Sequence, residues 1–282
     1  MKVIRDIKQM SLACQRLRRK GKSIGFVPTM GALHAGHLSL VKEAGRVNDI
    51  VVVSIFVNPM QFAPQEDFRR YPRPIKKDIA LCRKSGVDFV FYPDAVAMYP
   101  EGFQTSVAVE RLSRVLCGKS RPRHFRGVTT VVAKLFNVIQ PEVAYFGQKD
   151  AQQAIIIQRM SADLNFPLRI KIMPTIREKD GLAISSRNIY LSRQERKEAL
   201  VLSQSLDLAK GLIKNGIKDA HKIIAKMEQF IKSRKSASVD YISIVEAAGL
   251  KPVKKICGDC LIALAVWIGK TRLIDNAIIR NA

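Results

Sequence analysis

Two histidines three residues apart, His34 and His37, lie in a turn region that also contains Gly31 and Gly36. An apolar segment precedes this turn and ends at Pro28 and Thr29, and a helix is expected to begin near His37. The first N–H groups of a helix lack backbone partners and favour negative charge, while glycine lets the backbone approach a ligand closely. Imidazoles placed there could donate hydrogen bonds to a triphosphate and stabilise charge on a leaving pyrophosphate. The spacing therefore predicts a phosphate site.

Two other interpretations of these histidines are open. They could be packed inside the turn, although half of the chain's four histidines fall within these four residues. They could also supply two ligands to a zinc ion, but no cysteine or carboxylate nearby completes a familiar spacing. The phosphate interpretation is favoured because both imidazoles flank one glycine-bracketed turn, and we expect no metal held by protein ligands.

The motif His34-Ala35-Gly36-His37 resembles the HxGH signature of the nucleotidylyltransferase superfamily, which includes the class I aminoacyl-tRNA synthetases. Members of that superfamily usually carry a second, mobile motif with basic and hydroxyl side chains. The stretch Ile184, Ser185, Ser186 and Arg187 fits that role, because it follows the loop at residues 179–181. The alternative is that Ser186 caps a helix and Arg187 is a surface charge.

Five segments in order along the chain resemble the pantothenate synthetase (pantoate–β-alanine ligase) family. They are residues 28–40 (PTMGALHAGHLSL), 56–62 (FVNPMQF), 121–128 (RPRHFRGV), 146–153 (FGQKDAQQ) and 180–188 (DGLAISSRN). The resemblance extends from Gly25 to the TRLIDN at residues 271–276, which is nearly the whole chain. It implies a Rossmann-like N-terminal domain, a smaller C-terminal lid domain and a cytoplasmic homodimer.

The resemblance also implies a reaction in two steps. A carboxylate of pantoate attacks the α-phosphate of ATP, which is present with Mg²⁺, and the amine of β-alanine then opens the pantoyl adenylate. The products are pantothenate, AMP and pyrophosphate, on the route to coenzyme A. Such an enzyme needs no covalent nucleophile, because positioning, charge stabilisation and exclusion of water suffice.

The family's pattern assigns roles to residues at matching positions. His34, His37 and Lys149 are the expected catalytic residues, with His37 as general acid. ATP is expected to contact Met30, Gly31, Ala32, Leu33, His34, Ala35, Gly36, His37, Gly147, Gln148, Lys149, Asp150, Ile176, Ile184, Ser185, Ser186 and Arg187. Pantoate and β-alanine are expected to contact Gln61, Gln153, Asn58 and Arg123.

Amide side chains suit the role at Gln61 and Gln153, because an amide donates to a carboxylate and accepts from a hydroxyl. Their alternative role is that of a buried amide in the core. The chain departs from the family where Arg123 replaces the glycine of RPGHF, and where Lys76 and Lys77 stand in place of acidic residues. Both departures add positive charge and affect the expected substrate affinities more than the chemistry.

The elements that must position these residues follow an α/β pattern. Short apolar runs alternate with helical stretches up to about residue 174, which predicts a Rossmann-like parallel sheet. Strands are expected at residues 24–28, 50–57, 89–92, 143–146 and 168–173, and helices at 38–47, 76–85, 130–139 and 151–164. A smaller α+β domain is expected after them, with helices at 192–212 and 218–231 and strands at 241–245, 261–267 and 271–276. The predicted domains are residues 1–175 and 176–282.

Composition sets wider limits. A chain of 282 residues is long enough for about two domains. Its composition excludes disordered, collagen-like and coiled-coil classes. The longest apolar run, residues 260–269, is too short to span a membrane, and the N-terminal residues lack the core of a signal peptide. Five cysteines without framework spacing fit a reducing cytoplasm. The pair Cys257 and Cys260 could be a redox pair or half of a zinc site, but an ordinary structural role is favoured.

The net charge of +24 predicts attraction to anions of some kind. Lysines recur at every fourth residue from Lys210 to Lys226, which would form one charged helix face unless Gly216 interrupts it. A solvated face is favoured over a contact with RNA or a membrane. Two other functions stay open: an adenylyl-transferring enzyme that acts on tRNA, and a non-catalytic RNA-binding module. Only 7% of the chain is aromatic and the lysine stripe has no stacking residue, so no specific nucleic acid is expected.

Overall fold

The computed structural model describes residues 1–280 and divides the chain into two compact units. The first contains residues 1–114, 118–147 and 153–174. The second contains residues 115–117, 148–152 and the chain from residue 175 onward. Two short segments from the N-terminal part of the chain therefore group with the second unit. The simple division into residues 1–175 and 176–282 stays a prediction.

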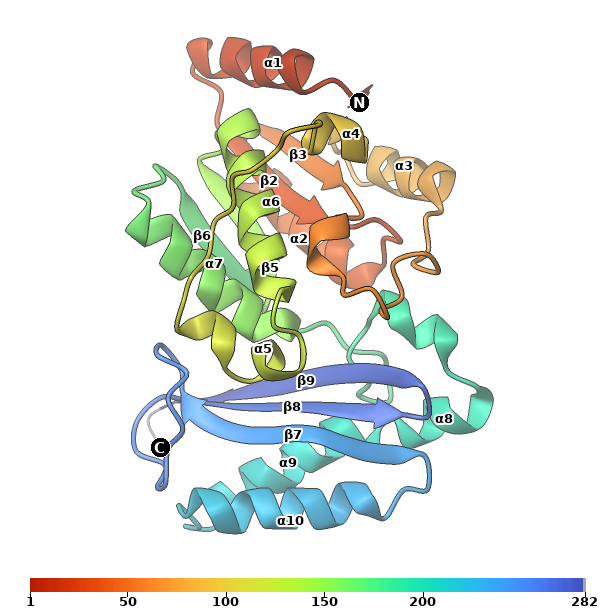
Figure 1. Cartoon of the computed structure of the whole chain (residues 1–282), viewed down its shortest axis with the longest axis vertical. Helices are drawn as coiled ribbons and strands as arrows, with labels where there is room; N and C mark the ends of the chain where they lie inside the picture. Colours follow the sequence, from red (N-terminus) through yellow and green to blue (C-terminus); the bar gives the residue numbers. More distant parts are fainter. Residues whose placement is uncertain (281–282) are drawn as a thin grey trace. The chain divides into compact units, whose positions relative to one another are not determined.

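Within residues 1–174, six parallel strands form one sheet in the order β1-β4-β3-β2-β5-β6 (Figure 1). Their bounds are β1 (Lys2–Ile4), β2 (Ile24–Thr29), β3 (Ile50–Ile55), β4 (Phe89–Phe91), β5 (Val143–Gly147) and β6 (Arg169–Met173). The helices of this part of the chain are α1 (Ile7–Arg19), α2 (Ala35–Val47), α3 (Ile75–Lys84), α4 (Ala95–Met98), α5 (Cys117–Ser120), α6 (His124–Ile139) and α7 (Ala151–Asp163). Short 3₁₀ turns are η1 (Pro59–Gln61), η2 (Leu112–Arg114) and η3 (Gln148–Asp150).

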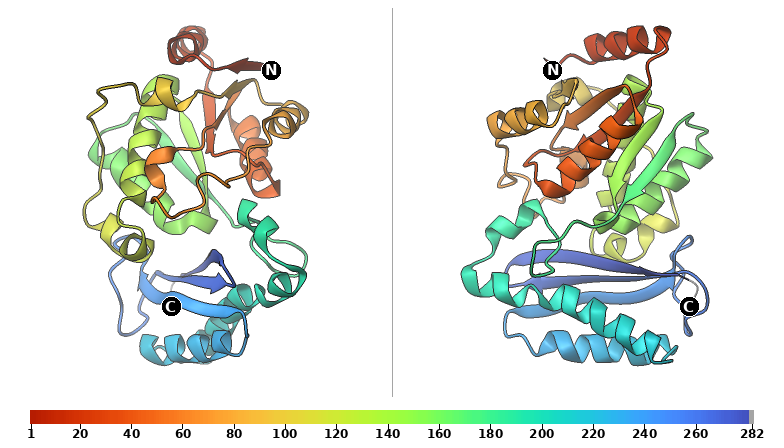
Figure 2. Two further views of the ribbon diagram at one scale, coloured as in Figure 1. Left: turned by 45° about the vertical axis from the view of Figure 1, so that its right-hand side comes forward. Right: turned by 180° about the vertical axis from the view of Figure 1, so that it is seen from behind.

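The parallel sheet is buried on both faces, because helices from its crossovers cover each one (Figures 1 and 2). Alternate residues of a strand point to opposite faces. In β3, Val52 packs into one core with Phe26 of β2 and Phe136 of α6. Val51 and Val53 pack into the other core. The strand predicted at residues 50–57 is therefore confirmed as β3, which ends at Ile55 and is buried on both faces.

The order of strands reverses at β2, which has β3 on one side and β5 on the other. In such sheets ligands bind beyond the carboxyl ends of the strands that flank the reversal. β2 ends at Thr29, directly before the turn with the two histidines, and β5 ends at Gly147. The fold of this unit thus places the predicted phosphate turn at the switch point.

The second unit is a separate α+β structure. An antiparallel sheet of β7 (Ala237–Glu246), β8 (Cys260–Ile268) and β9 (Thr271–Ile279) has β8 at its centre. Figure 1 shows α9 (Val201–Lys214) and α10 (Ala220–Lys232) along one face of this sheet, with α8 (Arg193–Glu198) before them. The turn η4 (Ser186–Tyr190) precedes α8. Parallel and antiparallel sheets together confirm the predicted fold class.

The structure corrects several predicted element bounds. The helix expected at residues 192–212 is two helices, α8 and α9, which are separated at Ala199 and Leu200. Its predicted start is close to the observed one, because Ser192 caps α8 and forms a capping box with Glu195. The helix expected at 130–139 begins six residues earlier, at His124. As predicted, Gly216 interrupts the lysine stripe, with a φ of +86° between α9 and α10. Across residues 1–280, no helix combines the length and apolar character needed to cross a bilayer.

Candidate active site

The turn after β2 is held in an unusual backbone conformation. Gly31 has a φ of +81°, which favours glycine, and a Cβ atom there would lie 3.0 Å from the carboxylate of Asp78 and from Ile55. The hydroxyl of Thr29 accepts a hydrogen bond from the Gly31 N–H at 3.1 Å and donates to the carbonyl of Ser54 at 2.8 Å. Glycine at this position therefore lets the chain turn tightly over its neighbours.

Asp78, in the first turn of α3, holds the middle of this turn. Its two carboxylate oxygens accept hydrogen bonds from the N–H groups of Ala32 and Leu33, each at 2.8 Å. The side chain is buried, with 1% of the residue exposed. Burial raises the pKa of Asp78, and the two N–H groups oppose that rise. A buried carboxylate with these partners fixes the backbone just before the two histidines.

The two histidines lie side by side at the start of α2. His34 is the N-cap residue, but its side chain makes no capping bond. Its ring stacks on that of His37, with ring centroids 4.0 Å apart and an angle of 27° between the planes. A Cβ at Gly36 would come within 3.0 Å of the His34 ring, so glycine leaves room for this stacking. The predicted pairing of two imidazoles at a helix N-terminus is thus present.

The pantoate candidate Gln61 contacts the turn that follows β2. It is 8% exposed, and its side-chain N–H group lies 2.8 Å from the sulfur of Met30. Asn58 donates to the Gln61 side-chain oxygen at 3.1 Å and to the Gly127 carbonyl at 3.0 Å, and it accepts from the hydroxyl of Tyr99 at 2.8 Å. These bonds occupy Asn58, so its geometry is that of a support for Gln61.

Residues of the RPRHF segment hold the Gln61 backbone. Arg121 donates to the Gln61 carbonyl at 3.3 Å and pairs with Glu66, and Nδ1 of His124 donates to the same carbonyl at 2.9 Å. Arg123 is exposed at the N-cap position of α6 and makes none of these bonds. Sequence reasoning singled out Arg123 and missed Arg121 and His124, whose partner is a backbone carbonyl.

Residues 148–152 contain candidates that the structure groups with the second unit. Lys149 lies in η3 and, with Ser185 and Asp275, lines a small pocket. Gln152 is buried and exchanges hydrogen bonds with residues 115 and 117, at 2.7 and 3.0 Å. Gln153 is half-buried and groups with the first unit. The amide of Gln152 therefore has a structural role, because it bonds backbone groups, whereas Gln153 is the candidate for substrate contact.

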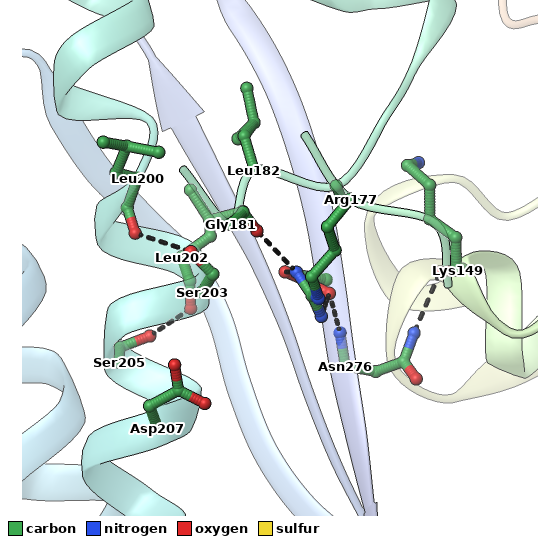
Figure 3. A network of polar contacts seen from close by, with 12 residues as sticks. Lys149, Arg177, Gly181, Leu182, Leu200, Leu202, Ser203, Ser205, Asp207 and Asn276 are labelled. Atoms are coloured by element: carbon green, nitrogen blue, oxygen red, sulfur yellow. Dashed lines mark hydrogen bonds and ion pairs between the residues drawn. The ribbon is translucent and has the colours of Figure 1, made fainter. Parts of the chain in front are cut away.

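The remaining candidates, Ile176 and residues 184–187, lie at the two ends of a hairpin in the second unit, in which Arg177 pairs with Ala183. Arg177 makes two bonds to the carboxylate of Asp275, at 2.6 and 2.9 Å. It also donates to the Gly181 carbonyl at 3.0 Å (Figure 3). The Asp275 carboxylate raises the pKa of Arg177. Ile176 and Ile184 pair by a backbone bond of 3.0 Å. These contacts hold the strand-like stretch that leads into residues 184–187.

Ser185 is the N-cap of η4, because its hydroxyl accepts from the Arg187 N–H at 3.3 Å. The capping role that was considered for Ser186 therefore falls to its neighbour. Among residues 1–280, no group of three or more histidines, cysteines, aspartates or glutamates is placed to hold a metal ion.

Comparison with known proteins decides the family. A sequence model described as pantoate-beta-alanine ligase matches residues 2–278. The chain belongs to the pantoate–β-alanine ligase family. A relative from Caldicellulosiruptor bescii named pantothenate synthetase is 52% identical over 279 residues, which cover 99% of each chain. The predicted family is therefore confirmed, and so is its activity, the ATP-dependent joining of pantoate and β-alanine.

Solved structures of the pantoate–β-alanine ligase family have the same fold. Pantothenate synthetase from Thermus thermophilus has a TM-score of 0.94 at 43% identity and covers 98% of this chain and 99% of its own. Pantoate-beta-alanine ligase from Francisella tularensis, complexed with beta-gamma ATP and beta-alanine, has a TM-score of 0.83 at 36% identity. The match to the Francisella tularensis structure covers 99% of this chain and 97% of the Francisella chain.

Asp78 is the positioning residue of this ligase that the sequence could have indicated. It occupies the buried stripe of α3 with Cys82, one turn later, where an apolar residue is expected. A carboxylate at a core position of a helix is costly unless it is hydrogen-bonded, so it signals specific partners. The sequence did not show which partners these are.

Proposed function

We propose that this ligase works through a pantoyl adenylate, with the paired imidazoles at the start of α2 stabilising charge on the phosphates. The observation that carries this proposal is the stacked pair His34 and His37 at the N-terminus of a 13-residue helix at the sheet's switch point. Both the helix N-terminus and imidazole N–H groups favour the negative charge that grows on departing pyrophosphate. His37 is the proposed general acid.

The proposed ATP contacts are those that the sequence indicated. In the first unit they are the turn from Met30 to His37 and Gly147, and in the second unit they are Gln148, Lys149, Asp150, Ile176 and residues 184–187. ATP enters as its Mg²⁺ complex, in which phosphate oxygens supply ligands to the ion. Lys149 is the proposed cation for the transferred phosphate.

The second proposed step is attack of the β-alanine amine on the pantoyl carbonyl, which forms the amide and releases AMP. The Francisella tularensis relative, complexed with beta-gamma ATP and beta-alanine, supports both small molecules as ligands of the family. Gln61, Gln153 and Arg123 stay proposed substrate contacts, and Asn58, first expected to be a contact, is proposed to act by holding Gln61. A homodimer, a cytoplasmic location and a lid role for the second unit are also part of this proposal.

Exchange of labelled pyrophosphate into ATP tests the order of steps. With pantoate and Mg²⁺ present and β-alanine absent, the purified protein is expected to exchange the label, because adenylation comes before amine attack. Omitting pantoate should abolish the exchange. Exchange that requires β-alanine would show that the adenylate is not formed first.

Replacing Gln61 by alanine is expected to act mainly through pantoate. Loss of the amide removes the donor to the pantoate carboxylate, so the KM for pantoate should rise by about tenfold, the effect of one charge-assisted hydrogen bond. Steady-state kinetics with each substrate varied would measure this change. A variant with an unchanged KM for pantoate and a raised KM for ATP would contradict the assignment of Gln61.

A further inference from the structure

A buried asparagine on β9, Asn276, makes hydrogen bonds to the segment that contains Lys149. Asn276 is 5% exposed and lies near the middle of β9, directly after the buried Asp275. Burying an amide is costly unless its donors and acceptor are satisfied. Its partners therefore indicate why an amide stands at this position.

The amide of Asn276 holds two consecutive peptide units. Its Nδ2 group donates to the carbonyl of Gln148 at 2.8 Å and to the carbonyl of Lys149 at 2.9 Å. Its Oδ1 atom accepts from the side chain of Gln148 at 3.3 Å. An amide offers two donors and an acceptor in one plane, a combination that hydroxyl and carboxylate groups lack. The two bonds to carbonyls fix the backbone of η3 at Gln148 and Lys149, and the third bond holds the Gln148 side chain.

The bonds reach the backbone of Lys149 and leave its side chain available. Figure 3 shows the Lys149 side chain pointing away from Asn276, while the dashed contact meets the main chain. Asn276 is itself held in place, because its N–H donates to the Asp275 carboxylate at 2.8 Å and Asp275 pairs with Arg177. The backbone position of Lys149 is thus set by a hydrogen-bonded network in the second unit, in which Asp275 and Asn276 are buried.

We propose that Asn276 is a positioning residue that acts through Lys149: it fixes the backbone from which the ammonium group reaches the transferred phosphate. This inference rests on the proposed role of Lys149. It predicts that Asn276 matters for adenylate formation and has no separate effect once the ammonium group is gone.

The test is a double-mutant cycle on pyrophosphate exchange. Asn276→Leu keeps the shape of the side chain and removes all three bonds, so the exchange rate should fall by about 10- to 100-fold, as expected for a misplaced catalytic group. The KM for pantoate should change by less than about twofold. Lys149→Ala should lower the rate by itself, and the double variant should be no slower than Lys149→Ala alone, because the two residues act as one unit.

A structural role alone would give a different pattern. In that case the effects of the two substitutions would multiply, and the inference would be wrong. Gln152→Met is the matched control, since it also removes a buried amide that bonds backbone groups of the second unit. This control should lower the melting temperature and leave the exchange rate within about threefold.

The remaining outcomes separate the inference from the proposed function. If Lys149→Ala exchanges pyrophosphate normally, the proposed role of Lys149 is wrong. If Lys149→Ala is slow and Asn276→Leu is not, only the positioning role is wrong. Asn276→Ser, which keeps one donor, covers the case in which the leucine variant does not fold. A folded serine variant with the parent's exchange rate would also overturn the inference.

Discussion

Replacing His37 by alanine is expected to lower pantoate-dependent pyrophosphate exchange by about 100- to 1000-fold, the effect of removing one donor aimed at transition-state charge. The fold should survive, because alanine has a higher helix propensity than histidine and the position lies in the first turn of α2. The ring it loses is half-buried and stacks on His34. The rate of exchange and the far-UV circular dichroism spectrum would be measured together.

His221→Ala is the matched control for this prediction. His221 is exposed in the first turn of α10, so the same chemical change occurs at a helix N-terminus outside the candidate site. Its exchange rate should equal that of the parent. A His37→Ala variant with near-normal turnover would show that the stacked pair has only a structural role.

Replacing Asp78 by asparagine is expected to lower both activity and stability. An amide keeps one acceptor and turns a donor toward the other N–H, so either Ala32 or Leu33 loses its partner in a buried site. The free energy of unfolding should fall by about 1–3 kcal/mol. The exchange rate should fall by about 10- to 100-fold, because the turn that precedes the histidines shifts. Urea unfolding and exchange kinetics would measure the two effects.

Asp94→Asn provides the control for the loss of a carboxylate. Asp94 caps α4 through one bond to the Ala97 N–H, at 2.7 Å, and asparagine caps a helix about as well as aspartate. Its stability and activity should therefore stay close to those of the parent. Equal losses in the two variants would mean that charge, and not the pair of buried N–H groups, explains the effect at Asp78.

Hydrophobic patterning was enough to predict the main strands and the parallel sheet. The run at residues 50–57 is apolar at every position except Ser54, and the structure buries Val51, Val52 and Val53 in two different cores. Strand β1 was missed because it has three residues, two of them exposed, and pairs only with β4. Such a short edge strand has no apolar period of its own.

Helix ends depended on packing as well as on local sequence. Helix α6 was expected at residues 130–139. Residues 124–129 include Gly127 and Thr129, which are weak helix formers. In the structure Phe125 and Val128 are buried, and the hydroxyl of Thr129 donates to the Phe125 carbonyl at 2.8 Å. Burial of the helix face therefore outweighs intrinsic propensity here.

The sequence by itself determined the family, the fold class and the paired histidines, because these depend on local spacing and on hydrophobic period. Only the tertiary structure showed what positions the candidate site. Asp78 bonds an N–H group 45 residues away, and Asn276 bonds a carbonyl 128 residues away. Their partners are backbone groups, which every residue possesses, so residue type at the partner positions carries no sign of the pairing. Such contacts exist only after the sheet and its crossovers have brought distant segments together.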